Sequence, residues 1–384
     1  MLGPDAERID HSCLSIGKED CKRVVLEGCN GSWAQEHYLP FLMKLAAREE
    51  IELWAIDVEE ELKLDQAETR EAWVIAKKRK AHYVNKSKEV ELYNELSAAD
   101  FVFVVSPAEF HSEIAEFWLS RASPKSRIFI EKPLDESVSA ALRLKSKSEE
   151  KRNVILAFDH YLAKAGSFLR DVGQYLQEVG PLERMEVHIL EPNGIPDNRA
   201  DALTKGVILD LLCHVLALVG AISDRSPAPS EATLRKVKLE AVMAARYLNS
   251  AIPGETFAWI EFLIEDLIVH CAIGKGVGTK DDKHMVIQGS KGLFELDLST
   301  RRFSVFDNRR SKKGSGKLSQ NRVEDFLEET LKGNTGHAPG VFDLDAALEI
   351  LKILDAARHR VDKQSEYTIG SSLGEVLRKL GATP

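Results

Sequence analysis

The sequence lacks a cysteine framework, an excess of positive charge and a long uninterrupted apolar run, and each absence argues against a class of protein. Its five cysteines are scattered through 384 residues with no CxxC pair, which is typical of free thiols in a reducing compartment rather than disulfides or zinc ligands. The net charge of -9 disfavours nucleic acid as a partner. The most apolar stretch, Gly206–Ile222, is interrupted by Asp210 and His214, so we expect no membrane span and no membrane partner.

The composition is that of a folded protein with room for two domains. Apolar residues make up 44% and charged residues 29% of the chain, which is enough for a packed core. We expect a flexible tail at 1–22, a dinucleotide-binding domain at 23–157, and a substrate-binding and oligomerisation domain at 158–384. The start of the chain shows no basic segment followed by an apolar core. We therefore expect a cytoplasmic protein. The scattered cysteines lead us to expect no metal site.

The first half alternates short apolar strands with amphipathic helices. Val24–Leu26 precedes a helical pattern over 33–48, and Ile51–Ile56 precedes a charged helical stretch ending near Lys80. Further strands are predicted at 81–84, 101–105, 127–130 and 154–158. The segment 101–105 has no polar residue, as in a parallel strand that is buried on both faces. This order predicts an α/β domain with a doubly wound parallel sheet.

Beyond residue 158 the pattern changes to helices and long alternating strands. Helices are predicted over 165–178, 206–221, 323–331 and 344–358, and strands over 185–190, 256–264, 267–273, 285–288 and 293–298. This order predicts an α+β domain with a large, mostly antiparallel, open sheet. The basic, Ser- and Gly-rich segment Arg309–Lys317 is interpreted as a solvated hairpin loop, with phosphate binding as the alternative.

A glycine-containing turn joins the first strand to the first helix. In GCNGSWA, residues 28–34, Gly28 permits a tight turn and Gly31 lets a pyrophosphate approach the backbone at a helix N-terminus. The second strand ends at Asp57, 29 residues after Gly28, where a carboxylate binds a ribose diol and repels a 2′-phosphate. No arginine follows closely. These features predict a Rossmann domain that prefers NAD, with NADP less favoured; the alternative is an ordinary α/β turn with an exposed aspartate.

Four further motifs carry a resemblance to a known family. SPAEFH lies at 106–111, IEKPL at 130–134, GVILDLLCH at 206–214 and IQGSKGLFELD at 287–297. In this order and spacing they resemble the glucose–fructose oxidoreductase/inositol dehydrogenase (Gfo/Idh/MocA) family, over roughly residues 23–360. The resemblance implies an NAD(P)-dependent oxidoreductase that acts on a sugar, polyol or sugar phosphate. It also implies assembly into a homodimer or homotetramer through the open sheet.

The same resemblance implies the residues that hold the cofactor. Lys132 would lie between the nicotinamide and the substrate hydroxyl, where its charge stabilises a developing alkoxide. The implied cofactor contacts are Gly28, Asn30, Gly31, Ser32, Trp33, Asp57, Ser106, Pro107, His111, Glu131 and Lys132. The chain departs from the family where Lys205 replaces the first of two glycines before the Asp–His helix, and where Ala217 replaces a frequent aspartate.

A second likeness concerns the substrate. FDHYLAK at 158–164, VHILEPNG at 187–194 and Arg199 are similar to motifs of glucose-6-phosphate dehydrogenases, which share the two-domain plan. The Asp–His spacing of those enzymes is one residue longer, and their long C-terminal part is absent here. This likeness implies substrate contacts from Asp159, His160, Tyr161, Lys164 and Arg199. It also makes Asp159 the carboxylate partner of His214, and it leaves a phosphorylated sugar open.

Asp210 and His214 are candidate catalytic residues together with Lys132. They are four residues apart and therefore project from the same face of a helix. A histidine there can take the hydroxyl proton near neutral pH, while Asp210 orients the substrate. The alternatives are a core histidine at 214 and a surface lysine at 132. A carboxylate on the same apolar helix favours function, because a buried charge needs a partner or a role.

Three classes of function remain open at the level of sequence. The leading one is an NAD-dependent dehydrogenase acting on a CH–OH group. The second is a ligand sensor that binds NAD and has lost turnover. The third is a glycosidase in which transient oxidation assists elimination. Fold alone does not decide among them.

Overall fold

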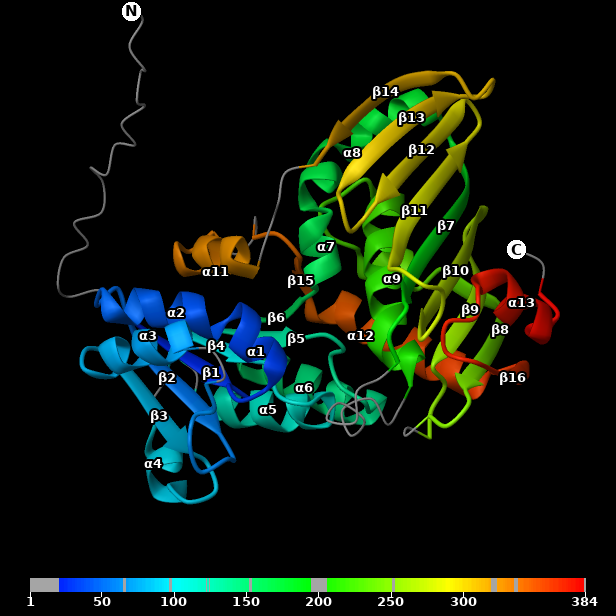
Figure 1. Ribbon diagram of the computed structural model, residues 1–384. Helices are drawn as coiled ribbons and strands as arrows, with labels where there is room; N and C mark the ends of the chain where they lie inside the picture. Colours follow the sequence, from blue (N-terminus) through cyan, green and yellow to red (C-terminus); the bar gives the residue numbers. More distant parts are fainter. Residues whose placement is uncertain are drawn as a thin grey trace, which may run out of the picture.

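The computed structural model describes residues 21–64, 67–96, 99–121, 123, 125–151, 154–194, 206–250, 253–318, 323–334 and 338–382. The predicted tail lies outside the described residues except for 21 and 22, and so do Arg199 and Lys205. Two sheets organise the described chain, one in each half of the molecule (Figure 1).

The first sheet has seven strands in the order β15-β6-β5-β4-β1-β2-β3. All pairs are parallel except that of β15 with β6. The bounds are Lys22–Glu27 (β1), Ile51–Asp57 (β2), Ala81–Asn85 (β3), Phe101–Val104 (β4), Arg127–Glu131 (β5), Val154–Phe158 (β6) and Val341–Asp343 (β15). The strand order reverses between β1 and β4. The turns after these two strands therefore face each other at the switch point where such sheets bind ligands.

Helices cover both faces of this sheet because its central strands are apolar on both sides. In β1, Val24 packs into the cluster that contains Leu42, whereas Val25 packs into the cluster that contains Trp118. The flanking elements are α1 (Ser32–His37), α2 (Leu39–Ala47), α3 (Ala67–Lys77), α4 (Val90–Glu95), η1 (Ala108–Phe110), α5 (His111–Arg121) and α6 (Val138–Lys151). Burial on both faces is what a parallel sheet requires.

The second sheet has nine strands in the order β14-β13-β12-β11-β7-β10-β9-β8-β16. It is antiparallel except for the pairs β7–β10 and β8–β16. The bounds are Leu182–Glu191 (β7), Val237–Tyr247 (β8), Phe257–Ile264 (β9), Leu267–Lys275 (β10), Asp282–Gly289 (β11), Gly292–Asp297 (β12), Arg302–Asp307 (β13), Lys312–Lys317 (β14) and Lys363–Tyr367 (β16). Helices α8 (Gly166–Val179) and α9 (Val207–Asp224) pack on one face. On the other face, α13 (Leu373–Leu380) covers the end formed by β8 and β16.

The last third of the chain returns to the first domain. Helix α11 (Val323–Leu331) places Phe326 against Phe158, with ring centroids 4.1 Å apart, inside the core of the first domain. Strand β15 then extends the first sheet beyond β6. Helix α12 (Leu344–His359) packs on both α6 and α9, and the short helices α7 (His160–Lys164) and α10 (Glu231–Leu234) complete the described elements. The two halves are thus joined by several segments (Figure 1).

The predicted fold class is confirmed, and two segments differ from their prediction. The helix predicted over 33–48 divides into α1 and α2 at Tyr38, because Pro40 lies in the first turn of α2. The segment 309–317, expected to be a loop, contains edge strand β14. Domain boundaries at 22/23 and 157/158 stay a prediction; β6 continues to Phe158.

Helix α9 corrects the expectation that no segment has the length and composition of a membrane span. Among the described residues, Val207–Asp224 alone satisfies both criteria. However, 83% of this helix is buried inside the protein, between the second sheet and α12. The core of the fold therefore accounts for its apolar composition. Cysteines 21, 29, 213 and 271 are free thiols, as predicted.

Candidate active site

The turn after β1 is shaped by glycine. Gly28 has a φ of 82°, and a Cβ at this position would lie 2.5 Å from the backbone nitrogen of Ser106. The Gly28 N–H donates to the carbonyl of Ile56 at 2.9 Å, which holds the turn against β2. At Gly31 a Cβ would meet only carbonyl oxygens, at 3.3 Å or more, and no side chain caps the helix that begins at Ser32. The turn thus has the open backbone surface that a pyrophosphate needs.

Asp57 ends β2 beside this turn. Its Oδ2 accepts from the backbone N–H of Asn30 at 2.8 Å, and its Oδ1 accepts from that of Val58 at 2.8 Å. A carboxylate offers about four lone-pair sites, so capacity remains for a ribose hydroxyl. Three glutamates follow Val58, and the nearby Lys63 is paired with Glu59 at 2.9 Å. The cofactor crevice is here the space between the turns after β1 and β4. Its edge beside Asp57 is therefore acidic.

The turn after β4 faces the first turn across the switch point. Ser106 Oγ is buried without a partner among the described residues, and Pro107 leads into η1. His111 was expected to contact the cofactor, but it is only 1% exposed. Its Nδ1 and Nε2 lie 2.9 Å and 2.7 Å from the carbonyl oxygens of Pro133 and Ser106. The structure thus places His111 behind the crevice, where it ties two loops together.

Strand β5 ends at Glu131, and Lys132 follows it. Glu131 Oε1 accepts from Trp33 Nε1 at 2.9 Å and from the Tyr38 hydroxyl at 2.7 Å, while Oε2 accepts from the Lys132 N–H at 3.2 Å. Burial raises the pKa of Glu131 to about 7, although the three donors favour its carboxylate. Glu131 therefore anchors α1 and α2 to the strand end and fixes the backbone that carries Lys132.

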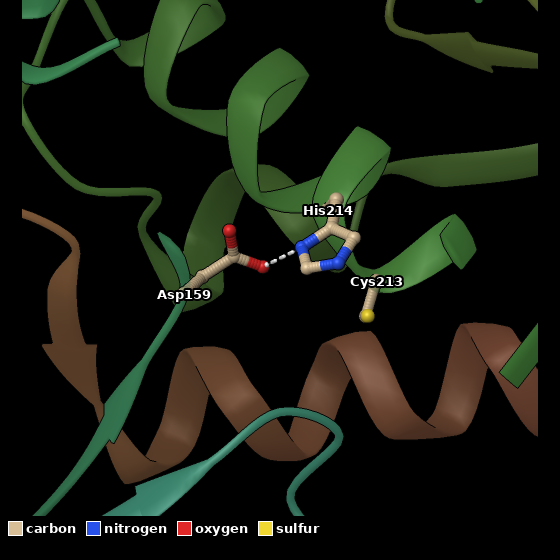
Figure 2. A group of neighbouring side chains, drawn as sticks. All are labelled: Asp159, Cys213 and His214. Carbon is tan, nitrogen blue, oxygen red and sulfur yellow. Dashed lines mark hydrogen bonds and ion pairs between the residues drawn. The ribbon is translucent and has the colours of Figure 1, made fainter. Parts of the chain in front are cut away.

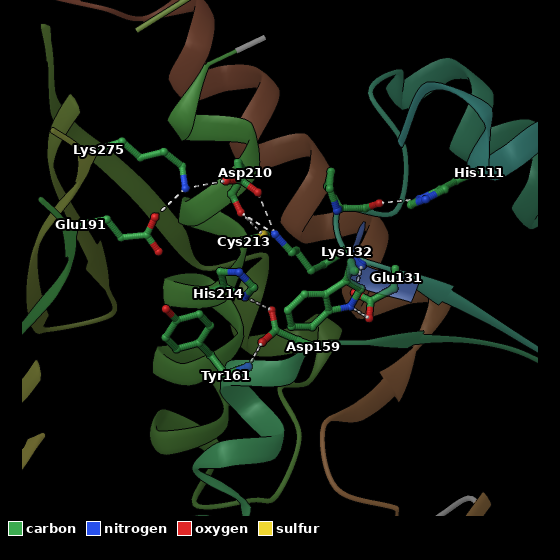
Figure 3. A network of polar contacts seen from close by, with 12 residues as sticks. His111, Glu131, Lys132, Asp159, Tyr161, Glu191, Asp210, Cys213, His214 and Lys275 are labelled. Carbon is green, nitrogen blue, oxygen red and sulfur yellow. Dashed lines mark hydrogen bonds and ion pairs between the residues drawn. The ribbon is translucent and has the colours of Figure 1, made fainter. Parts of the chain in front are cut away.

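Lys132 of the first domain meets Asp210 of α9 (Figure 3). Its Nζ donates to Asp210 Oδ1 at 2.8 Å and to the Asp210 carbonyl at 3.1 Å, while Lys275 Nζ lies 3.9 Å from Oδ2. Burial alone would lower the pKa of Lys132, but Asp210 outweighs burial and raises that pKa well above its usual range. Burial opposes ionisation of Asp210 too, yet Lys132 and Lys275 hold the pKa of Asp210 low. Lys132 is thus a permanent cation, suited to electrostatic catalysis.

His214 lies one helical turn beyond Asp210 and pairs with Asp159 (Figure 2). Its Nδ1 is 2.6 Å from Asp159 Oδ2, and both side chains are 1% exposed. Asp159 Oδ1 also accepts from the N–H groups of Tyr161 and Leu162 as the N-cap of α7. Burial lowers the pKa of His214, Asp159 opposes that effect, and the Lys132 charge adds to it. The neutral imidazole therefore donates from Nδ1 and leaves Nε2 as a proton acceptor.

His214 and Asp159 also satisfy the spacing of a metal site with Cys213 (Figure 2). Two features argue against a metal there. The Cys213 thiol contacts the Asp210 carbonyl at 3.2 Å, and burial raises its pKa well above the usual range. Because a thiol must lose its proton to bind a metal, the group is better described as a hydrogen-bonded pair beside a buried thiol.

His160 and Tyr161 separate His214 from a cavity of about 670 Å³. The His160 ring lies between Trp33 and His214, with centroids 4.7 Å and 4.5 Å away, and the Tyr161 ring is also 4.5 Å from His214. His160 Nδ1 is buried without a partner among the described residues, and burial lowers the pKa of its imidazole strongly. His160 thus offers a neutral hydrogen-bonding group beside the cavity.

Three basic side chains line the same cavity. Lys164, Lys283 and Arg301 line it, and Lys164 Nζ lies 4.9 Å above the Tyr161 ring. Burial lowers the pKa of Lys164, and the positive charges of Lys283 and Arg301 lower it further. Acidic residues at 36, 281 and 324 also line the cavity. The three cations are nevertheless close enough to repel one another, which an anion would relieve.

Sequence reasoning missed several residues of this network. Lys275 bonds Glu191 at 2.7 Å (Figure 3). Lys283 bonds the other oxygen of Glu191 at 3.0 Å, and Tyr38 donates to Glu131. Glu191 and Lys275 are direct partners in the parallel pair β7–β10. Glu191 lies in the VHILEPNG motif, which assigned it no role, and no local motif marks Lys275. Only the register of two strands that are distant in the sequence could have identified this pair.

The geometry defines a Rossmann domain whose cofactor crevice adjoins a polar site shared with a second domain, as in an oxidoreductase. The family described as "oxidoreductase family, NAD-binding Rossmann fold" (Gfo/Idh/MocA) matches residues 22–160. The first domain therefore matches the NAD-binding Rossmann domain of the Gfo/Idh/MocA family, as its motifs predicted. A comparison with curated proteins gives no match.

Solved structures extend the likeness across both domains. UDP-N-acetylglucosamine 3-dehydrogenase from Acidithiobacillus ferrooxidans is 16% identical with a TM-score of 0.63, and the match covers 89% of this chain and 98% of that one. A 3-ketoreductase from Actinomadura kijaniata, in complex with NADP and TDP-benzene, is 13% identical with a TM-score of 0.67, covering 91% and 100%. Glucose-6-phosphate 1-dehydrogenase from Mycobacterium avium is 15% identical with a TM-score of 0.66, covering 91% and 94%. At these identities the likeness establishes the shared two-domain fold.

Proposed function

We propose that this protein transfers a hydride between a nicotinamide cofactor and a CH–OH carbon of a sugar, polyol or sugar phosphate. One observation carries the proposal: Lys132, at the end of a Rossmann strand, bonds Asp210 one helical turn before the His214–Asp159 pair. A fixed cation and a neutral base then lie where the two domains meet. Two of the solved neighbours carry a sugar substrate in their names, UDP-N-acetylglucosamine and glucose 6-phosphate, which supports the same substrate class.

The residues of the crevice fit NAD. Gly28 and Gly31 leave the backbone of the first turn open, and the buried Ser106 hydroxyl has no partner among the described residues. Asp57 would hold the ribose diol. When bound, the nicotinamide accepts or supplies the hydride. We assign Asn30, Ser32 and Trp33 to the same crevice because they belong to its first turn and helix.

In the oxidation direction, the chain's own residues handle the hydroxyl proton and the charge on oxygen. The Lys132 ammonium donates a hydrogen bond to the substrate oxygen and stabilises the alkoxide character that develops there. His214 takes the hydroxyl proton at Nε2, while Asp159 keeps the imidazole in the accepting tautomer. Asp210 orients a neighbouring hydroxyl. Because His214 is 1% exposed, substrate access requires the His160 ring to move. A homodimer or homotetramer stays a prediction.

A substrate screen tests the proposed function. The purified protein is incubated with NAD and a panel of sugars, polyols, sugar 6-phosphates and nucleotide sugars, and NADH absorbance is followed. We expect NADH formation with at least one member. Binding of NAD without turnover on any member would favour the sensor. Release of a free sugar from glycosides without net NADH would favour the glycosidase.

Cofactor choice gives a first prediction. We expect NAD to bind at least about tenfold more tightly than NADP, because Asp57 and the following glutamates repel a 2′-phosphate. Asp57→Ser narrows this gap by relieving the repulsion. Calorimetric titration with each cofactor measures both effects, and Asp266→Ser, in the exposed turn between β9 and β10, is the matched control. Tighter NADP binding by the wild type would contradict the role assigned to Asp57.

Substrate charge gives a second prediction. We propose that a phosphate or another anion of the substrate binds between Lys164 and Arg301, with His160 as a neutral donor. The wild type then prefers a sugar 6-phosphate to the free sugar, and Lys164→Ala raises KM for the phosphorylated form by about tenfold. Lys44→Ala, at an exposed position of α2, is the control. Equal KM values for both sugars, unchanged in Lys164→Ala, would indicate a neutral substrate.

A further inference from the structure

The face of the second sheet that points away from α8 and α9 carries a second group of histidines and carboxylates. None of these residues has been assigned to catalysis. This group, here called the β7–β11 cluster, consists of Glu186, His188, Asp282 and His284. His188 and His284 are direct partners in the antiparallel β7–β11 register. Glu186 lies two residues before His188 on β7, and Asp282 lies two residues before His284 on β11. All four side chains therefore project from one face of the sheet.

The strand alternation separates this cluster from the active site. Met185 and Val187 project from the opposite face of β7, where they join the core under the helices. Lys283, between the two β11 members of the cluster, likewise faces Glu191 on the active-site side. The cluster therefore lies on the opposite face of the sheet from the residues assigned to hydride transfer.

Asp282 orients both imidazoles. Its Oδ1 lies 2.5 Å from His284 Nδ1, and its Oδ2 lies 3.3 Å from His188 Nδ1. A carboxylate can only accept, so each Nδ1 carries a proton when Asp282 holds both rings. Each Nε2 then keeps its lone pair. This carboxylate–histidine arrangement is the one that orients histidine ligands around metals in proteins.

The remaining ligand atoms converge. Glu186 Oε1 lies 2.9 Å from His188 Nε2, and ligand atoms of Glu186, His188 and His284 all lie within 4.8 Å of one another. The side chains of these three residues are 40%, 11% and 34% exposed, respectively. An ion can therefore reach them from solvent, and a water molecule can complete its coordination.

We propose that the β7–β11 cluster binds one zinc ion through Glu186, His188 Nε2 and His284 Nε2, with Asp282 as a positioning residue. Two imidazoles and one carboxylate suit zinc and related transition metals, whereas calcium and magnesium prefer oxygen ligands alone. The site holds three protein ligands and leaves the fourth position to water or another donor.

Metal uptake by the full chain tests the proposal. Chelator-treated protein is dialysed against Zn²⁺, and bound metal is measured by mass spectrometry. We expect one zinc per chain, loss of binding in His188→Ala and His284→Ala, and affinity weakened by about 10- to 100-fold in Asp282→Asn. Glu186→Gln tests the most exposed ligand with the least risk to folding, and we expect its affinity to fall at least about tenfold. His359→Ala, at a histidine that is 77% exposed on α12, is the control.

Three outcomes would overturn the proposal. One is a folded wild type, judged by circular dichroism, that takes up no zinc, because the cluster is then an ion-pair network around a protonated His188. The second is zinc retained in His188→Ala, His284→Ala and Glu186→Gln. The third is zinc lost in Cys213→Ser but kept in His188→Ala, which would place the metal at the buried Asp159–Cys213–His214 group.

Discussion

Replacing His214 with asparagine is expected to lower kcat by about 10²-fold or more while leaving NAD affinity near the wild-type value. Asparagine keeps a polar group beside Asp159 but cannot take a proton from the substrate. The pair is buried, and Nδ1 of His214 lies 2.6 Å from Asp159. We therefore do not expect a water molecule to replace the imidazole as proton acceptor in the variant. Steady-state NADH formation with the best substrate of the screen measures kcat, and calorimetry measures NAD affinity.

The pH profile distinguishes a base from a structural histidine. Because burial lowers the pKa of His214 from its ordinary value of 6.5, the imidazole is neutral and active above that pH. For the wild type we expect kcat/KM for oxidation to fall only as pH drops below about 6.5. The acid limb disappears in His214→Asn. His82→Asn, at an exposed histidine of β3, is the control. Near-normal turnover of His214→Asn with an unchanged acid limb would remove His214 from the mechanism.

Replacing Lys132 is expected to cost about 10²- to 10³-fold in kcat, because its charge acts where the substrate oxygen becomes negative. Asp210 raises the pKa of Lys132 far above neutrality, so this residue contributes charge rather than a titrating base. Lys132→Met keeps most of the side-chain volume and removes the charge. We expect kcat of Lys132→Met to fall at every pH, and its acid limb to move to higher pH, because the Lys132 charge no longer lowers the pKa of His214.

Stability needs a separate control, because Lys132→Met leaves Asp210 with Lys275 at 3.9 Å as its remaining cation. Breaking a buried ion pair from one side can cost roughly 3–5 kcal/mol, less where solvent screens the pair, as it does here at 17% and 22% exposure. The double variant Lys132→Met/Asp210→Asn removes both charges and is expected to recover stability but not activity. Recovery of both would mean that the pair is only structural. Thermal melting and kcat separate the two results.

The parallel sheet could be predicted from sequence because its strands are short, apolar and separated by helices. Phe101–Val104 is buried along its whole length, and this simple pattern predicts a central strand. The edge of the second sheet was harder. Strand β14 has the sequence KKGSGK, with neither apolar residues nor alternation. Its pairing with β13 forms the strand, and a sequence pattern carries no record of that backbone pairing.

The candidate site could be predicted where one motif contains two interacting residues and the family resemblance implies what each of them does. Asp210 and His214 share a helix face, and the structure brings Asp159 to His214 as the second likeness implied. Contacts between distant segments were not predictable in this way. Glu191 and Lys275 are 84 residues apart, and only the sheet register joins them. Nothing in the sequence indicated that both ring nitrogens of His111 contact backbone carbonyls of two different turns.

The return of the chain to the first sheet bears on how the protein is made at the ribosome. Phe326 stacks on Phe158, and β15 covers the outer edge of β6, yet both segments emerge long after the strands they complete. During synthesis the β6 edge therefore stays open while more than half of the chain is still to come, and open strand edges are places where chains associate wrongly. A fragment ending near residue 157 carries the same exposed edge permanently. For this chain, the dinucleotide-binding half reaches its final form only when the C-terminal segments arrive.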